Sequence, residues 1–204
     1  INRFCSSGLN AVAMAADRIR VGEADVMIAG GAESMSMVPM TGNKPSFNAQ
    51  IFEKEENIGI AYGMGLTAER VAAQWKVTRD MQDAFALASH QKAVAAQKAG
   101  EFADEMTAID VVEKFPDLAK HELAVKTRTV DIDEGPRADT TLDVLAKLRP
   151  VFAAKGSVTA GNSSQMSDGA GALILASERA VKEHNLTPLA RFVGFAVKGV
   201  PPQI

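Results

Sequence analysis

The 204-residue sequence contains a single cysteine, and its charges nearly balance. One cysteine excludes an internal disulfide and suits a reducing compartment. Lys and Arg together number 22 against 25 Asp and Glu, so the net charge is −3 and no global basic field gathers nucleic-acid phosphates. No apolar run reaches the roughly 18 residues of a membrane span. We therefore expect no nucleic-acid partner and no membrane span, and an anionic ligand must be bound by local groups.

Metal-ligand spacing is also missing from the sequence. The three histidines, His90, His121 and His184, are scattered and share no ligand pattern with the one cysteine, so no metal site is predicted. His90 lies in a polar stretch of a predicted helix, His121 in a charged segment and His184 beside an acidic residue. We expect all three to be solvated surface residues rather than catalytic bases.

Glycine and proline are too few for a low-complexity chain, at 16 and 8 residues. Apolar residues make up 47% and charged residues 23%, which is ordinary for a globular protein and sufficient for a sizeable core. At about 150 residues per domain, the length fits either one large domain or a core with an insertion.

Hydrophobic periodicity predicts regular elements at both ends of the chain and a less regular stretch between them. Apolar residues recur at helical spacing from Leu9 and stop at Gly22, and the apolar run at 24–31 is typical of a buried strand. This pair belongs to a βαβ unit whose leading strand is a stub or missing. Further elements are predicted as follows: a helix capped by Thr67 and ending at Trp75, strands at 109–112 and 125–130, a helix at 141–147, a strand at 170–175, a helix at 178–185 and a strand at 190–197.

The longest predicted helix begins after Thr78, which is a suitable N-cap residue, and ends before Gly100. Asp80 in its first turn complements the helix dipole. One side carries a stripe of small and apolar residues, which we expect to pack on a neighbour as core: Met81, Ala84, Phe85, Ala88, Ala95 and Ala99.

Cys5 stands just before the first turn of the first predicted helix. There it faces unpaired backbone amides and the positive end of the helix dipole, which favour a thiolate over a thiol. The next three residues are small, so a substrate carbonyl can approach the sulfur while nearby amides hold oxyanion charge. The residues alone leave two interpretations open, an acyl-transfer nucleophile or a packed small hydrophobic residue at a strand end.

Five ordered motifs resemble the thiolase family over essentially the whole chain. The first is the nucleophile segment, which combines Asn2–Ala11 with Ala29–Ser36. The other four are Met64–Ala72, Arg79–Ala86, Leu148–Phe152 and Val158–Ala170. The resemblance implies an α/β fold with a layered α-β-α core, here an incomplete first half, and an inserted α+β loop domain. It assigns residues 1–35 and 166–189 to the first core half, 36–165 to the loop domain and 190–204 to the start of the second half.

The same resemblance implies that Cys5 is the acyl-accepting nucleophile of an acyltransferase. Its thiolate attacks the 3-keto carbon of a 3-ketoacyl-CoA, acetyl-CoA leaves, and CoA then takes the acyl group. The family's catalytic histidine, in a Gly-His-Pro motif, and its second cysteine are expected beyond Ile204, so this chain by itself should not turn over.

Coenzyme A is thus expected as a substrate, and no permanently bound cofactor is expected. The family's contacts to CoA carry over onto Arg137 and Thr140 in the loop domain and onto Ser164 near the pantetheine arm. Arg137 offers a forked cation to a phosphate, which is the local group that the balanced charge requires. Met64 is assigned to substrate binding with them.

Gly63 stands where short-chain biosynthetic thiolases commonly have a histidine before the methionine. A glycine leaves room for a longer acyl chain, so the degradative, β-oxidation branch is favoured over biosynthetic acetoacetyl-CoA thiolase. The remaining alternative is a non-catalytic, thiolase-like acyl-CoA-binding protein. The resemblance also implies a homodimer or homotetramer, and we expect a bacterial cytoplasmic location, with mitochondrion or peroxisome as alternatives.

Overall fold

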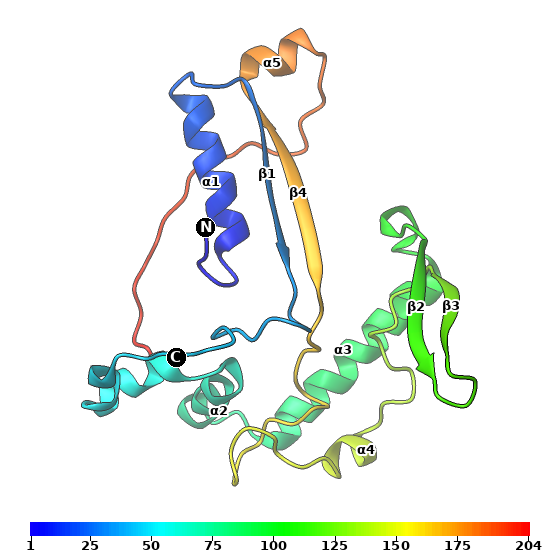
Figure 1. Ribbon diagram of the computed structural model, residues 1–204. Coiled ribbons are helices and arrows are strands. Elements are labelled where there is room, and N and C mark those ends of the chain that lie inside the picture. The colour runs from blue at the N-terminus through cyan, green and yellow to red at the C-terminus, as the bar shows by residue number, and fades with distance from the viewer. The chain divides into compact units, whose positions relative to one another are not determined.

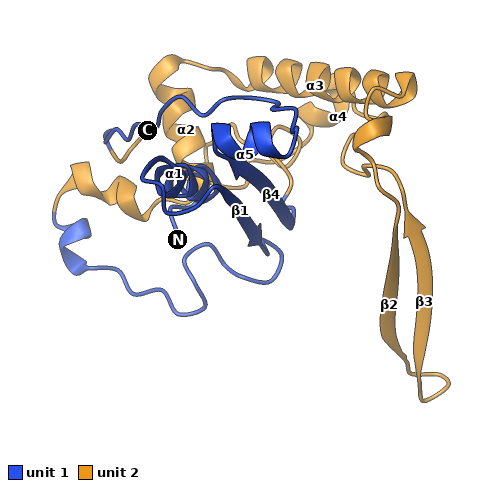
Figure 2. Cartoon of the chain, turned by 90° about the horizontal axis from the view of Figure 1, so that it is seen from above, with its two compact units in different colours: residues 1–53, 166–201 blue, residues 54–165, 202–204 orange.

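The computed structural model describes residues 1–204, and the chain divides into two compact units (Figure 2). Unit 1 comprises Ile1–Glu53 and Met166–Pro201, and unit 2 comprises Lys54–Gln165 and Pro202–Ile204. Helices and strands are both present, which confirms the predicted mixed α/β class. The domain boundaries expected from the resemblance stay a prediction.

Unit 1 is built on one antiparallel strand pair with the helices α1 and α5 beside it (Figure 1). Its elements are α1 (Ser7–Arg20), β1 (Val26–Glu33), a 3-10 turn (Ala49–Phe52), β4 (Gly169–Ala176) and α5 (Glu178–Glu183). β1 and β4 pair from Val26 opposite Ala176 to Glu33 opposite Gly169. Helix α1 packs on this pair, and Ala13, Ala16 and Ala29 are buried.

The end of α1 follows the prediction closely. Gly22 adopts φ +78, a left-handed conformation that glycine tolerates, and its amide donates to the carbonyl of Ile19 at 3.0 Å. The leading strand of the βαβ unit is predicted to be a stub or missing, and the structure has no strand there: Arg3 and Cys5 form only an isolated bridge. The only partner of β1 is therefore β4, which runs antiparallel to it.

Unit 2 joins three helices and a hairpin. Its elements are a 3-10 helix (Glu55–Ala61), α2 (Met64–Trp75), α3 (Arg79–Ala99), a 3-10 turn (Ala103–Glu105), β2 (Ile109–Asp117), β3 (Glu122–Val130) and α4 (Leu142–Ala146). Thr78 caps α3 by accepting from the Met81 amide at 3.3 Å, and Gly100 ends it at φ +73. β2 and β3 form an antiparallel hairpin, longer than the two predicted strand segments.

Two element predictions are wrong. Helix α2 begins at Met64 with Gly63 as its N-cap, and Thr67 lies inside the helix because its amide already donates to the Gly63 carbonyl at 3.2 Å. No strand forms at 190–197, because no other segment of the chain offers hydrogen bonds to this stretch.

The stripe predicted to be the core face of α3 is also wrong. Phe85 is 77% exposed and Met81 is exposed as well, whereas Asp83, on another face of the helix, is 4% exposed. The inward face is polar here because Asp83 has fixed partners, Arg79 and Asn162.

The sizeable core expected from the composition is not present, because few apolar side chains of this chain are buried. The buried apolar residues are Ala13, Ala15, Ala16, Ala29, Leu145, Val158 and Ala180, most of which are alanines. On the sheet, Ile28 and Ile174 lie opposite each other and are 70% and 71% exposed. A two-stranded sheet with one packed helix cannot cover such side chains. Of the helices in the structure, none combines the length and the apolar character that crossing a membrane requires.

Candidate active site

Cys5 lies in a tight turn that leads into α1. Phe4 adopts φ +50, which is uncommon for a residue with a side chain and is found at functional turns. The turn is held by Ser7, whose hydroxyl donates to the Phe4 carbonyl at 2.8 Å and accepts from the Arg3 amide at 2.7 Å. Cys5 is exposed, so the interpretation as a packed hydrophobic residue does not fit this conformation.

The amides at the start of α1 fall into two groups. The Ser6 and Ser7 amides donate to the carbonyls of Arg3 and Phe4 at 3.1 and 3.0 Å, and the Ser6 side chain makes no capping bond. The amides of Gly8 and Leu9 have no acceptor within the chain. These two amides are therefore the donors that the helix start can offer to an anion.

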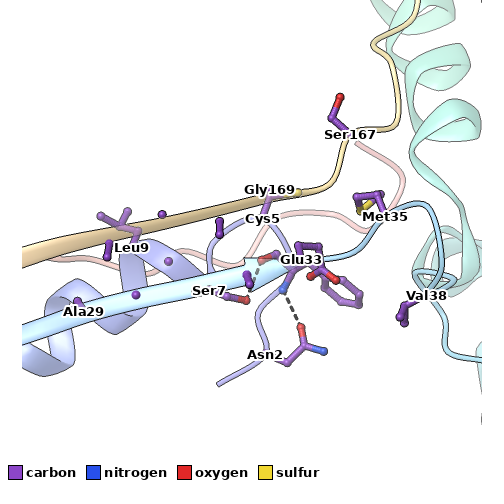
Figure 3. Close-up of a pocket in the computed structure, with 18 of the residues that line it drawn as sticks. Asn2, Cys5, Ser7, Leu9, Ala29, Glu33, Met35, Val38, Ser167 and Gly169 are labelled. Carbon is purple, nitrogen blue, oxygen red and sulfur yellow. Dashed lines mark hydrogen bonds between the residues drawn. The ribbon is translucent and has the colours of Figure 1, made fainter. Parts of the chain in front are cut away.

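Cys5 lines a cavity of about 900 Å³ that lies entirely within unit 1 (Figure 3). Its wall comes from the turn before α1, the first turns of α1, the end of β1, the loop after β1 and the start of β4. The lining is mainly apolar and includes Phe4, Leu9, Val12, Met35, Val38 and Leu173. Cys5 and Glu33 are its only ionisable side chains, and none of the three histidines lines it. The volume is that of an ordinary small-molecule site.

Asp168 forms hydrogen bonds to Ser36 at the end of the β1–β4 pair where Glu33 lies opposite Gly169. Its carboxylate accepts from the Ser36 amide at 2.8 Å and from the Ser36 hydroxyl at 2.6 Å. The Ser36 hydroxyl first, and then the Ser36 amide, hold the pKa of the Asp168 carboxyl below its ordinary value of 3.8. This clamp joins the loop after β1 to the segment before β4, and both segments contribute residues to the Cys5 cavity.

Asp25 forms hydrogen bonds to Ser177 and Arg179 at the other end of the pair, where Val26 lies opposite Ala176. Its carboxylate accepts from the Ser177 hydroxyl at 2.8 Å and from Arg179 Nε at 3.1 Å, with Arg179 Nη2 on its second oxygen. Arg179, followed by Ser177, lowers the pKa of the Asp25 carboxyl. The two strands that border the cavity are therefore fixed in register at both ends.

Arg137 and Thr140 lie in one turn of unit 2, where the Thr140 amide donates to the Arg137 carbonyl at 3.4 Å. The Arg137 guanidinium is exposed and contacts both oxygens of Asp139 at 3.4 Å, which lowers the pKa of the Asp139 carboxyl. The Arg137 amide donates to His90 Nδ1 at 3.1 Å. His90 is therefore half-buried beside this turn, which corrects its predicted place on the solvated surface.

Ser164 and Met64 also belong to unit 2. Ser164 is exposed and directly follows the segment 157–163, which hydrogen bonds hold in place. Met64 is the first residue of α2 and is 61% exposed. The structure brings Arg137 and Thr140 together in one turn, and it places Ser164 and Met64 on separate segments.

Polar residues that the sequence did not single out organise unit 2 around the segment before Ser164. They are Arg79, Glu69, Gln82, Asp83, Ser157 and Asn162. Glu69, Arg79, Gln82 and Asp83 lie on helices and inside the motifs Met64–Ala72 and Arg79–Ala86, but a polar residue inside a helix is equally typical of a solvated face. Ser157 and Asn162 lie on the loop that precedes Ser164.

The Thiolase, N-terminal domain family model matches residues 1–179, and the chain belongs to this family. The chain is 45% identical over its whole length to 3-ketoacyl-CoA thiolase of Bacillus subtilis (strain 168), of which it covers 51%. It is 44% identical, again over its whole length, to acetyl-CoA acetyltransferase of Rhizobium meliloti (strain 1021), of which it covers 52%. The chain thus spans about half the length of these curated relatives.

Solved structures give the same result. The dimeric peroxisomal thiolase of Saccharomyces cerevisiae matches with a TM-score of 0.78 and 38% identity, over 100% of this chain and 49% of that chain. Human mitochondrial 3-ketoacyl-CoA thiolase in complex with CoA matches with a TM-score of 0.69 and 40% identity, over 93% of this chain and 47% of that chain. The resemblance found in the sequence is confirmed. The relatives include bacterial and mitochondrial proteins, so the cellular location stays a prediction.

Proposed function

We propose that the intact protein is an acyltransferase that cleaves a 3-ketoacyl-CoA with CoA, through an acyl intermediate on Cys5. The observation that carries this proposal is the placement of Cys5. Its thiol is exposed at a strained turn, beside the free amides of Gly8 and Leu9, on the wall of a cavity of about 900 Å³. Relatives named thiolase and acetyl-CoA acetyltransferase support the same chemistry.

In the first step the Cys5 thiolate adds to the 3-keto carbon, and the carbonyl oxygen becomes an oxyanion. The amides of Gly8 and Leu9 are the donors available to such charge. When the oxyanion collapses, the bond between C2 and C3 breaks, and its electron pair takes up a proton as acetyl-CoA leaves. The CoA thiol then attacks the Cys5 thioester, gives the shortened acyl-CoA and returns the thiolate.

Proton transfer in both steps requires groups other than those lining the cavity. The family resemblance assigns this work to the histidine and the second cysteine expected beyond Ile204. Glu33 is the only other ionisable side chain in the cavity wall, and no hydrogen bond joins it to Cys5.

Coenzyme A is proposed to contact Arg137, Thr140 and Ser164. The exposed Arg137 guanidinium suits a phosphate, and Thr140 shares its turn. The solved human relative is described as a complex with CoA, which fits the same ligand. We propose CoA as a substrate here, not as a resident cofactor.

We propose that the protein belongs to the degradative branch, because Gly63 stands in place of a histidine. A Cβ at this position meets no atom within 4 Å, so no other part of the chain fills the place that a histidine side chain would take beside Met64. The intact protein should then prefer 3-ketoacyl-CoA substrates longer than acetoacetyl-CoA, and Gly63→His should remove that preference. A wild type that is fastest with acetoacetyl-CoA would assign it to the biosynthetic branch instead.

The decisive experiment is mass spectrometry of the intact protein after brief incubation with a 3-ketoacyl-CoA. A mass increase equal to the shortened acyl group, mapped to Cys5 and absent in Cys5→Ala, supports the proposal. Binding of acyl-CoA without acylation would make the protein a non-catalytic acyl-CoA-binding member of the family. A homodimer or homotetramer is also proposed, since one solved relative is dimeric, and light scattering of the intact protein tests it.

A further inference from the structure

The carboxylate of Glu69, in the middle of α2, is held by a distant loop. Both of its oxygens accept from the Ser157 amide, at 3.0 and 2.9 Å, and Oε1 also accepts from the Val158 amide at 2.9 Å. The Ser157 hydroxyl adds a bond at 3.2 Å. Glu69 is half-buried, so these charge-assisted bonds form where water competes weakly.

The backbone next to Ser157 is shaped for this approach. A Cβ on Gly156 would collide with the Glu69 carboxylate, so only glycine lets the chain pass at this distance. Gln82 on α3 supports the contact by donating from Nε2 to the Ser157 hydroxyl at 2.8 Å. The loop therefore meets Glu69 with two backbone amides and one side chain, each already directed at the carboxylate.

A second carboxylate holds the far side of the same loop. Asp83 on α3 is 4% exposed, forms an ion pair with Arg79 at 2.7 Å and accepts from Asn162 Nδ2 at 2.9 Å. Asn162 Oδ1 in turn accepts from the amide of Thr159, a fully buried residue, at 2.7 Å. Leaving either carboxylate without its partners would bury an unpaired charge or amide, which is costly.

The network ends one residue before Ser164. The Ser163 hydroxyl donates to the Thr159 carbonyl at 2.6 Å, and Ser164 follows it as an exposed residue. The position of Ser164 is thus set by a loop that two acidic residues, from two helices, fix at both sides.

We propose that Glu69 and Asp83 are positioning residues that place Ser164 for the pantetheine arm of CoA. They act through the loop 157–163 and not by touching the ligand. This inference rests on the proposed function, because it takes CoA as the ligand of Ser164.

The test is steady-state kinetics of Glu69→Gln in the intact protein. The substitution keeps the size of the side chain and removes its charge and one acceptor oxygen. The KM for CoA should rise roughly 10- to 100-fold, because small displacements of a contact residue have effects of this order. The kcat at saturating CoA should change little. Partial unfolding would instead lower kcat and leave KM unchanged.

Two comparisons sharpen the result. With pantetheine as the acyl acceptor, the rise in KM for Glu69→Gln should persist, whereas Arg137→Ala should show a defect with CoA and little with pantetheine. Glu101→Gln, at an exposed glutamate outside the network, is the matched control and should behave as wild type. Ser157→Ala, which removes only the hydroxyl, should give a smaller rise and serves if Glu69→Gln does not fold.

The outcomes separate the two proposals. A wild type that neither binds CoA nor performs thiolysis overturns the proposed function, and this inference with it. An active wild type whose Glu69→Gln and Ser157→Ala variants keep the wild-type KM for CoA overturns the inference alone. A defect that appears with CoA but not with pantetheine overturns it as well, because Ser164 would then not be the affected contact.

Discussion

The Asp168 carboxylate accepts two hydrogen bonds from Ser36, a residue 132 positions earlier, at 2.8 Å from the amide and 2.6 Å from the hydroxyl. Both bonds go to the charged form of the acid, so both are stronger than their neutral counterparts. Because the two residues flank β1 and β4 at the edge of the Cys5 cavity, this contact couples the shape of the cavity to the register of the strand pair.

We expect Asp168→Asn to lower the free energy of unfolding at neutral pH. The folded state holds the pKa of Asp168 below its ordinary value of 3.8, so the carboxylate stabilises the fold above that value and loses its contribution as pH falls through the lowered pKa. Urea unfolding of the intact protein at pH 7 and at successively lower pH measures the difference between variant and wild type. That difference should be constant near neutrality and shrink in acid.

Asp104→Asn, in an exposed 3-10 turn, is the control and should be indistinguishable from wild type. If the stability difference between Asp168→Asn and wild type grows on acidification, the stabilising role of the Asp168 carboxylate is contradicted. Protonation in acid removes the charge of Asp168 in the wild type, whereas the asparagine of the variant carries no charge to lose.

Gly8→Ala should slow the acylation of Cys5 without lowering the free energy of unfolding. A Cβ there meets no atom within 4 Å, yet Gly8 lines the cavity beside Cys5. Stability should be unchanged or slightly higher, because alanine favours a helix more than glycine does. The rate of Cys5 acylation in a rapid-quench experiment should fall roughly tenfold or more, since the methyl group adds bulk to the wall of the cavity that Cys5 also lines. Gly194→Ala, also in open space but away from the cavity, should acylate normally.

The parts of the fold that the sequence predicts correctly are those set by local chemistry. Thr78 caps α3 and Gly100 ends it, because a side-chain acceptor and a left-handed residue act within a few positions of themselves. Thr67 shows the limit of this reasoning. It has the right side chain for an N-cap, but the backbone had already become helical three residues earlier.

The sequence-based predictions are wrong where residues far apart in the chain determine which side of an element is buried. The apolar stripe containing Phe85 predicts a packed face, but α3 turns Asp83 inward because Arg79 and Asn162 are there to receive it. The i,i+4 spacing of Arg79 and Asp83 is visible within the helix, but Asn162 is 79 residues away from Asp83, so the helix alone does not show that this face is buried.

In the candidate site, too, the features set by neighbouring residues could be predicted and those set by distant residues could not. The place of Cys5 before a helix follows from neighbouring residues, and the structure adds that the Ser6 and Ser7 amides are already engaged, leaving those of Gly8 and Leu9. Glu69 lies inside the motif Met64–Ala72, but the sequence does not show its role, because a glutamate inside a helix is typical of a solvated face until its partner loop is known.

Gly161→Ala should destabilise the protein by about 1–3 kcal/mol, as overpacking of a filled site does. A Cβ on Gly161 would stand 2.5 Å from Leu145 Cδ2 and 2.5 Å from Leu148 Cδ1. Leu145 is buried and cannot move aside freely. Thermal or urea unfolding beside Gly199→Ala, where nothing lies within 4 Å, isolates the steric effect. Equal stability of the two variants would show that the leucines repack without cost.

Neutralising Asp139 should tighten the binding of CoA. In the structure the Asp139 carboxylate contacts the Arg137 guanidinium at 3.4 Å through both oxygens, so it competes with a phosphate for the same cation. Because the pair is exposed, the gain for Asp139→Asn should be modest, about two- to fivefold in Kd by calorimetry, and should fade as salt is added. Arg137→Ala should weaken binding, and adding Asp139→Asn to it should change nothing more, because the competitor then has no cation to occupy. If Asp139→Asn tightens binding equally with and without Arg137, the carboxylate repels CoA directly, and the proposed role of Arg137 as the phosphate ligand fails.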